Sequence, residues 1–129
     1  MARDFRKILA WQKADGLAFE VYHVTREFPS EELYGGLATQ LRAATVAAAV
    51  EIADGSARRG EAAFVRSLQQ AQSALTAVDY YLSLAQRLGF LDELDYNRLQ
   101  ELRGEAAGLL YGFTSALEQR VREAPAGVA

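Results

Sequence analysis

The sequence contains no cysteine, and only one histidine and two prolines occur among its 129 residues. The lack of cysteine excludes disulfides, thiolate metal ligands and cysteine nucleophiles. A single histidine leaves a serine nucleophile or a histidine-rich metal centre without its usual partners. The pair Gly35-Gly36 lacks the strand and the lysine of a phosphate-binding loop. We therefore predict that the protein is not an enzyme and uses no cofactor and no metal.

Long apolar runs are also missing. No uninterrupted apolar stretch approaches ~18 residues, and the first residues lack the apolar core of a signal peptide. We expect a cytoplasmic protein with no membrane partner and no small-molecule substrate. The formal net charge is -3, whereas general nucleic-acid binders are usually basic. Contact with RNA or DNA would therefore need a local basic patch.

The residues that are abundant favour helices. Alanine, leucine, glutamate, arginine and glutamine dominate, and no alternating strand pattern persists. Hydrophobic residues make up 50% and charged residues 24%, a balance typical of a globular domain. We predict one all-α domain over residues 1–129, an up-down-up-down antiparallel four-helix bundle. Its helices should span about 5–26, 36–54, 60–88 and 93–122, and residues 123–129 should form a frayed tail.

The third predicted helix has the most regular apolar pattern. Its apolar residues alternate by four and three, as in the seam of a bundle, at Phe64, Leu68, Ala71, Leu75, Val78, Leu82 and Ala85. Gly89 should cap this helix, with Phe90 making the accompanying apolar contact. Asp92 should cap the next helix. The short turn predicts an antiparallel hairpin of the third and fourth helices.

The second and fourth predicted helices suggest contacts with another subunit. Residues 43–50 are apolar nearly all round, which is typical of a helix buried on more than one side. Gly55 should end this helix in left-handed geometry.

The fourth helix has an apolar face of Leu99, Leu102, Ala106, Leu109, Phe113, Leu117 and Val121, and a row of glycines at Gly104, Gly108 and Gly112. Each glycine costs a helix about 1 kcal/mol relative to alanine, so we expect a neighbouring helix to come close there. Ala48 and the three glycines are the candidate oligomer interface.

Two basic groups are candidates for phosphate contacts. One lies around the turn between the second and third helices and contains Arg42, Arg58, Arg59 and Arg66, and the other is N-terminal and contains Arg3, Arg6, Lys7 and Lys13. Guanidinium groups bind phosphates in a bidentate way. Glu51, Asp54 and Glu61 are close enough in sequence to form ordinary ion pairs with the first group. Both interpretations stay open.

One pair of residues resembles a metal-ligand motif. Glu20 and His23 have the Glu-x-x-His spacing that di-metal helical bundles use. Such a site needs two copies of the motif, and the sequence has a single histidine. The alternative is a surface histidine beside Glu27.

An ordered set of short motifs extends from residue 4 to about residue 91. The motifs are Asp4-Phe5-Arg6-Lys7, Trp11-Gln12-Lys13-Ala14, Phe28-Pro29, Glu32-Leu33-Tyr34-Gly35, Gln40-Leu41-Arg42-Ala43-Ala44, Ile52-Ala53-Asp54-Gly55 and Leu88-Gly89-Phe90-Leu91. The set resembles the 23S rRNA intervening-sequence proteins, to which the accessory variability protein of diversity-generating retroelements is related. The resemblance implies a four-helix bundle assembled as a homopentameric ring. The retroelement relatives associate with nucleic acid and a reverse transcriptase, and the resemblance therefore implies RNA, DNA or a ribonucleoprotein as a candidate partner.

These observations lead to one main functional hypothesis and two alternatives. The main hypothesis is a self-assembling accessory or scaffold protein that meets RNA, DNA or a ribonucleoprotein partner through Arg42, Arg58, Arg59 and Arg66. The first alternative is a protein–protein interaction module that binds no nucleic acid. The second is a di-metal bundle enzyme that uses Glu20 and His23.

Overall fold

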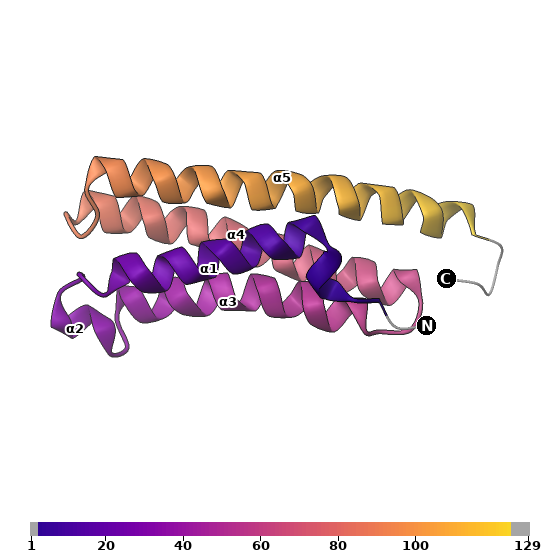
Figure 1. Cartoon of the computed structure of the whole chain (residues 1–129), viewed down its shortest axis with the longest axis horizontal. Coiled ribbons are helices and arrows are strands. Elements are labelled where there is room, and N and C mark those ends of the chain that lie inside the picture. The colour runs from indigo at the N-terminus through magenta and orange to yellow at the C-terminus, as the bar shows by residue number, and fades with distance from the viewer. Residues whose placement is uncertain (1–2, 125–129) are drawn as a thin grey trace.

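The computed structural model describes residues 3–124 as a helical bundle (Figure 1). Its elements are a 3-10 turn, η1 (Phe5–Lys7), and the helices α1 (Leu9–Thr25), α2 (Ser30–Leu33), α3 (Leu37–Ser56), α4 (Glu61–Arg87) and α5 (Glu93–Glu123). The described residues contain no strand. The all-α prediction with four long helices is thus confirmed. Glu123 is the last residue of α5, and residues 125–129 of the predicted tail lie outside the described part.

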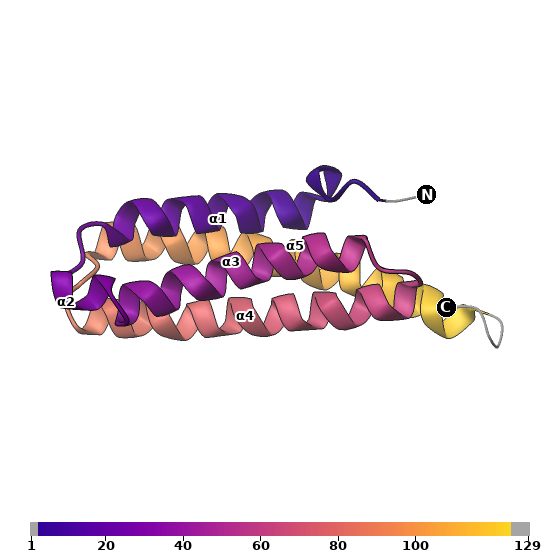
Figure 2. The same cartoon turned by 90° about the horizontal axis from the view of Figure 1, so that it is seen from below.

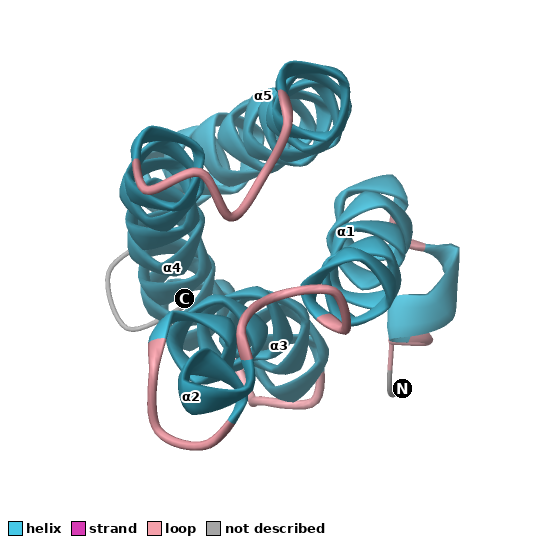
Figure 3. Ribbon diagram, turned by 90° about the vertical axis from the view of Figure 1, so that its left-hand side faces the viewer, coloured by secondary structure: helices cyan, strands magenta, loops and turns pink. Residues whose placement is uncertain are grey.

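The four long helices surround one core. Seen along the bundle, α1 has α3 and α5 as neighbours, and α4 has the same two (Figure 3). Two connections, the α2 segment and the α4–α5 turn, lie at one end of the bundle (Figures 1 and 2). The α3–α4 turn and the N-terminal segment lie at the other end (Figure 1). Because α3 and α5 occupy opposite corners, their outer faces point away from each other.

The core follows the predicted apolar patterns closely. All seven residues of the predicted α4 seam are 0% exposed. The other helices contribute fully or almost fully buried residues to the same core, among them Leu17, Val21, Leu41, Ile52, Leu99 and Leu110. In α5 the predicted face is wrong at one position. Leu110 is buried there, whereas Leu109 is 38% exposed, so the buried stripe is rotated toward the next residue.

The first predicted helix is interrupted near its start. The Asp4 side chain accepts a hydrogen bond from the Arg6 backbone N–H and caps η1. Ile8 then adopts extended geometry (φ -81°, ψ 118°) before α1 begins. The Gln12 side chain donates to the Arg6 carbonyl at 2.8 Å and satisfies one backbone group at this break. The N-terminal segment packs back on α1, with the rings of Phe5 and Trp11 at 4.9 Å, edge to face.

Gly55 does not end α3, which is a correction to the sequence prediction. It stays inside the helix, and a Cβ added there would lie 2.5 Å from the Ser67 Cβ and 3.0 Å from Phe64 Cδ1. The missing side chain therefore lets α4 approach α3 closely. The left-handed glycine of this connection is Gly60 (φ 80°), directly before α4.

The α4–α5 turn confirms the predicted caps. Gly89 has φ 81°, and the Phe90 N–H donates to the Ala85 carbonyl at 2.8 Å, which is the Schellman pattern. The Asp92 carboxylate accepts from the Asp95 N–H at 2.8 Å and caps α5. This turn is set by local chemistry, and for that reason the sequence alone predicts it.

Candidate functional site

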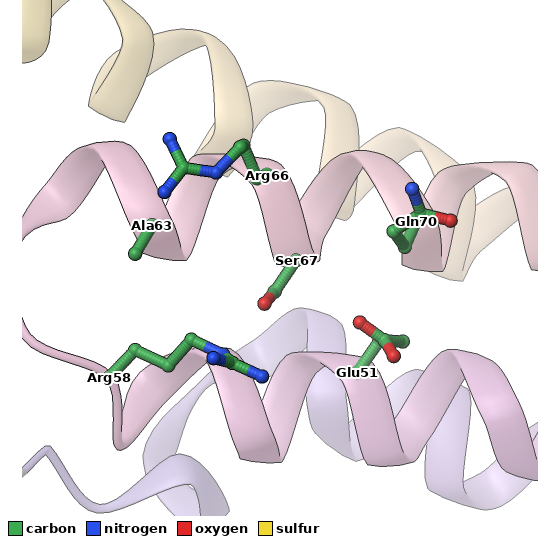
Figure 4. Close-up of a pocket in the computed structure, with 6 residues that line it drawn as sticks. All are labelled: Glu51, Arg58, Ala63, Arg66, Ser67 and Gln70. Atoms are coloured by element: carbon green, nitrogen blue, oxygen red, sulfur yellow. The ribbon is translucent and has the colours of Figure 1, made fainter.

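Two of the four predicted arginines share a pocket. Arg58, from the α3–α4 turn, and Arg66, from α4, line an open pocket of about 230 Å³ between the two helices (Figure 4). We call this pocket, lined by Glu51, Arg58, Ala63, Arg66, Ser67 and Gln70, the turn site. Gly55 positions it, because the close α3–α4 approach brings Ser67 next to α3. Of the four predicted arginines, Arg58 and Arg66 therefore line one pocket.

Acidic groups balance part of the positive charge in the turn site. The Arg58 guanidinium forms an ion pair with the Asp54 carboxylate at 2.8 Å. Glu51 lines the same pocket and comes from the α3 side, as Figure 4 shows. Arg59 is exposed in the turn and does not line the pocket. A phosphate at the turn site would therefore compete with the Asp54 carboxylate for Arg58 and would meet the negative charge of Glu51.

The N-terminal basic group meets the same end of the bundle. Arg3 donates to the carbonyls of Ser56 at 3.1 Å and Arg58 at 3.4 Å. Its guanidinium also lies over the Phe64 ring, 4.7 Å from the centroid. Arg3 of the N-terminal group is thus next to Arg58 of the turn in space. Among the N-terminal residues, Lys13 lies farther along α1 and pairs with Glu105 of α5 at 3.1 Å.

Arg42 does not belong to the turn site, although the sequence grouped it there. It lines a separate pocket of about 380 Å³ with Phe19, Tyr22 and His23 of α1 and with Arg26, the C-cap residue of that helix. We call these five residues the α1 site. α3 returns beside α1, and this arrangement brings Arg42 to the α1 surface.

The α1 site holds its arginines with neutral groups. Arg42 donates from Nε to the Thr25 hydroxyl at 2.8 Å, and its guanidinium lies over the Tyr22 ring at 4.8 Å. Arg26 donates from Nη2 to Nδ1 of His23 at 2.6 Å. A guanidinium has only donors, so Nδ1 accepts in this contact and the ring proton lies on Nε2. Among residues 3–124, neither arginine forms an ion pair with a carboxylate.

The sequence prediction missed Phe19, Tyr22 and Arg26 as site residues. Phe19 and Tyr22 are 74% and 47% exposed, so neither belongs to the apolar stripe that α1 turns to the core. Their separations of three and four residues, with Arg26 following four residues after Tyr22, place all three on one outer face of the helix. That spacing in the sequence could have indicated that the three residues share one surface.

The glycine row of α5 faces outward. A Cβ added at Gly104, Gly108 or Gly112 would have no neighbouring atom within 4 Å. Within residues 3–124, therefore, no other helix uses the groove. Either the helix tolerates the cost of these residues or a partner outside the protomer fills the groove.

The predicted contact residue on α3 lies inside the protomer. Ala48 is 0% exposed and packs in the core, so it is not a surface contact. The outward apolar residues of this helix are Val46 and Val50, which are 38% and 55% exposed. The prediction that α3 is apolar on two sides is therefore confirmed, and Val46 and Val50 lie on the side that faces away from the core.

The profile of the 23S rRNA-intervening sequence protein family matches residues 6–112 of this sequence. The chain belongs to this family. A similar solved structure is that of a protein with unknown function from the S23 ribosomal protein family of Bacteroides thetaiotaomicron VPI-5482. The identity is 16%, the match covers 82% of this chain and 98% of the other, and the TM-score is 0.76. This likeness shows the fold. No match was found among curated proteins.

Glu20 and His23, the two residues of the metal hypothesis, both contact arginines in this member of the 23S rRNA-intervening sequence protein family. Glu20 accepts from Arg98 at 2.9 Å, and His23 contacts Arg26. Within residues 3–124, no group of three or more histidine and carboxylate side chains is placed to hold a metal ion. The same part of the chain has no helix with the length and apolarity that a bilayer crossing requires.

Proposed function

We propose that this member of the family is a non-enzymatic accessory protein that assembles with copies of itself into a closed ring through α3 and α5. The observation that carries the proposal is the open glycine row of α5. Each of Gly104, Gly108 and Gly112 costs the helix about 1 kcal/mol relative to alanine, and no contact with the described part of the protomer offsets that cost. A second subunit packed into the groove would offset it.

The two candidate contact faces are different and lie on opposite corners of the bundle. One is the glycine row of α5, and the other is the outward face of α3 with Val46 and Val50. Contact between unlike faces is heterologous, and repetition of such a contact closes a ring when the rotation allows it. Small residues on α5 leave room for valine side chains of the neighbouring subunit. The number five comes from the family resemblance seen in the sequence motifs.

The test is the molar mass in solution. Light scattering or sedimentation should give a homo-oligomer for the wild-type chain, and Gly108→Leu should lower the molar mass while the helical circular dichroism persists. Gly16→Leu is the matched control, because Gly16 on α1 also has no atom within 4 Å of an added Cβ. Val50→Arg tests the other face. A monomeric wild-type protein would end the proposal. Ala48 is unsuitable for this test, because a larger side chain there would disturb the core.

A nucleic-acid role for the turn end of the bundle is a second candidate. It is supported by the convergence of Arg3, Arg58, Arg59 and Arg66 on the α3–α4 turn. Replacement of Arg58 and Arg59 by alanine should weaken binding to structured RNA or duplex DNA and flatten its salt dependence. Unchanged affinity and slope would remove these residues from the proposal. The remaining alternative is a protein partner, which a pull-down with the wild-type chain would detect.

A further inference from the structure

The α1 site combines exposed aromatic rings with cationic groups. Phe19 is 74% exposed and Tyr22 is 47% exposed, and both line one pocket with His23, Arg26 and Arg42. Exposed rings beside arginines are the combination that binds single strands, because every base offers a face for stacking and every nucleotide a phosphate. We propose that the α1 site is a docking site for single-stranded nucleic acid.

The positive charge of the α1 site is available to a ligand. Arg42 uses Nε for the Thr25 hydroxyl and its flat face for Tyr22, and these contacts leave both η nitrogens free of any ion pair within residues 3–124. Arg26 contacts His23 through Nη2 and Nε. Both guanidinium groups are therefore oriented by neutral partners and line the pocket without a carboxylate partner in residues 3–124, so a phosphate there can accept their hydrogen bonds.

Three acids at this end of the bundle do not line the pocket of the α1 site. Glu20 accepts from Arg98 of α5 at 2.9 Å. Glu32 accepts from the Leu37 N–H at 2.6 Å and caps α3. Glu27 follows Arg26 in the sequence but does not line the pocket. Within the pocket of the α1 site itself, the lining residues thus include two arginines and no acid, although the chain as a whole is acidic.

The shape of the surface favours a polymer over a single nucleotide. Phe19 lines the pocket of the α1 site and also a second one, of about 470 Å³, that continues along α1 toward α5. The charged residues that line this second pocket are Lys13, Asp15, Glu20 and Arg98, of which Arg98 is paired with Glu20. A strand can therefore stack one base on Tyr22 or Phe19 and pass to the neighbouring pocket. A duplex cannot do this, since its bases are stacked on one another.

Binding of a fluorescein-labelled oligothymidylate of about 15 nucleotides to the whole protein, followed by anisotropy, tests the proposal. Phe19→Ala should weaken binding about tenfold, since stacking on an aromatic side chain contributes strongly for each base. Arg26→Gln should weaken it a few-fold and reduce the salt slope. The matched controls are Tyr80→Ala, an exposed tyrosine on α4, and Arg87→Gln, an exposed arginine on α4. Both controls should bind as the wild type does.

Three outcomes would overturn the proposal. The first is absence of wild-type binding at low salt, and the second is an equal loss in the control variants. The third is a change in molar mass with Phe19→Ala without any effect on the oligonucleotide, which would assign this face to a contact between copies. The test is independent of the ring and of the turn end. Arg58→Ala with Arg59→Ala should weaken duplex binding, whereas Phe19→Ala should leave duplex binding unchanged.

Discussion

The turn site and the α1 site each contain two arginines, but their arginines have different partners. In the turn site, Arg58 is paired with Asp54 at 2.8 Å, and Glu51 lines the same pocket. In the α1 site, Arg26 and Arg42 contact a histidine, a threonine and a tyrosine ring. A local count of arginines in the sequence favours the α3–α4 turn as the surface that binds phosphates. Within residues 3–124 Arg66 forms no ion pair, so the two sites differ in the pairing of Arg58 and in the presence of Glu51, and the α1 site is the one whose pocket has no acid.

The largest expected effect is on stability and comes from disrupting the close contact of α3 and α4 beside the turn site. Gly55→Ala should lower the free energy of unfolding by about 1–3 kcal/mol, because the new Cβ would lie 2.5 Å from the Ser67 Cβ and push α3 from α4. Urea unfolding followed by circular dichroism measures this. Gly16→Ala is the control, since its Cβ enters open space and helix propensity should raise stability. Equal unfolding midpoints for Gly55→Ala and wild type would show that the close approach is not required.

A smaller effect should follow from loosening the α1 site. Thr25 is 1% exposed, and its hydroxyl donates to the Val21 carbonyl at 2.6 Å and accepts from Arg42. Thr25→Val keeps the shape but removes this acceptor, so it should lower the free energy of unfolding by about 1 kcal/mol and weaken oligothymidylate binding. Thr45→Val is the matched control, because the buried Thr45 hydroxyl bonds only carbonyls of its own helix. Equal effects of the two variants on binding would contradict the anchoring role of Thr25.

The smallest effect should come from making the turn site resemble the α1 site. Asp54→Asn removes the carboxylate partner of Arg58, so the affinity for duplex DNA at low salt should rise about two- to fivefold. Stability should change little, because the pair is exposed. Asp79→Asn, which frees Arg103 at the middle of the bundle, is the control for a general loss of negative charge. A similar gain in both variants would mean that net charge alone sets the affinity.

The sequence predicts the core of the bundle well, because helical periodicity is a local property. The α4 seam and the caps at Gly89 and Asp92 follow from spacing and from residue chemistry. The break at Ile8 was not predicted, because it depends on the Asp4 cap and on the bond from Gln12 to the Arg6 carbonyl. Such contacts depend on how the N-terminal segment folds back on α1, and residue type alone does not predict them.

The glycines show why site prediction was harder. The glycine expected to end a helix, Gly55, is the one that permits close helix packing, whereas Gly108 and its neighbours in the row are open within the protomer. Glycine has no side chain, so the sequence cannot show whether its space is filled by another helix. Arg42 was grouped with the turn for a similar reason. Its partners, Thr25 and Tyr22, are on another helix that only the tertiary fold brings near.

The packing of Trp11 against Phe5 makes the intrinsic fluorescence of this protein a local signal. Trp11 is the sole tryptophan in the sequence, and its ring meets that of Phe5 at 4.9 Å. Its emission should therefore report whether η1 is docked on α1. Because Arg3 ties this same segment to the α3–α4 turn, a ligand that displaces Arg3 would shift the emission of a residue it never touches. The chain thus carries an optical probe of the turn end without any label.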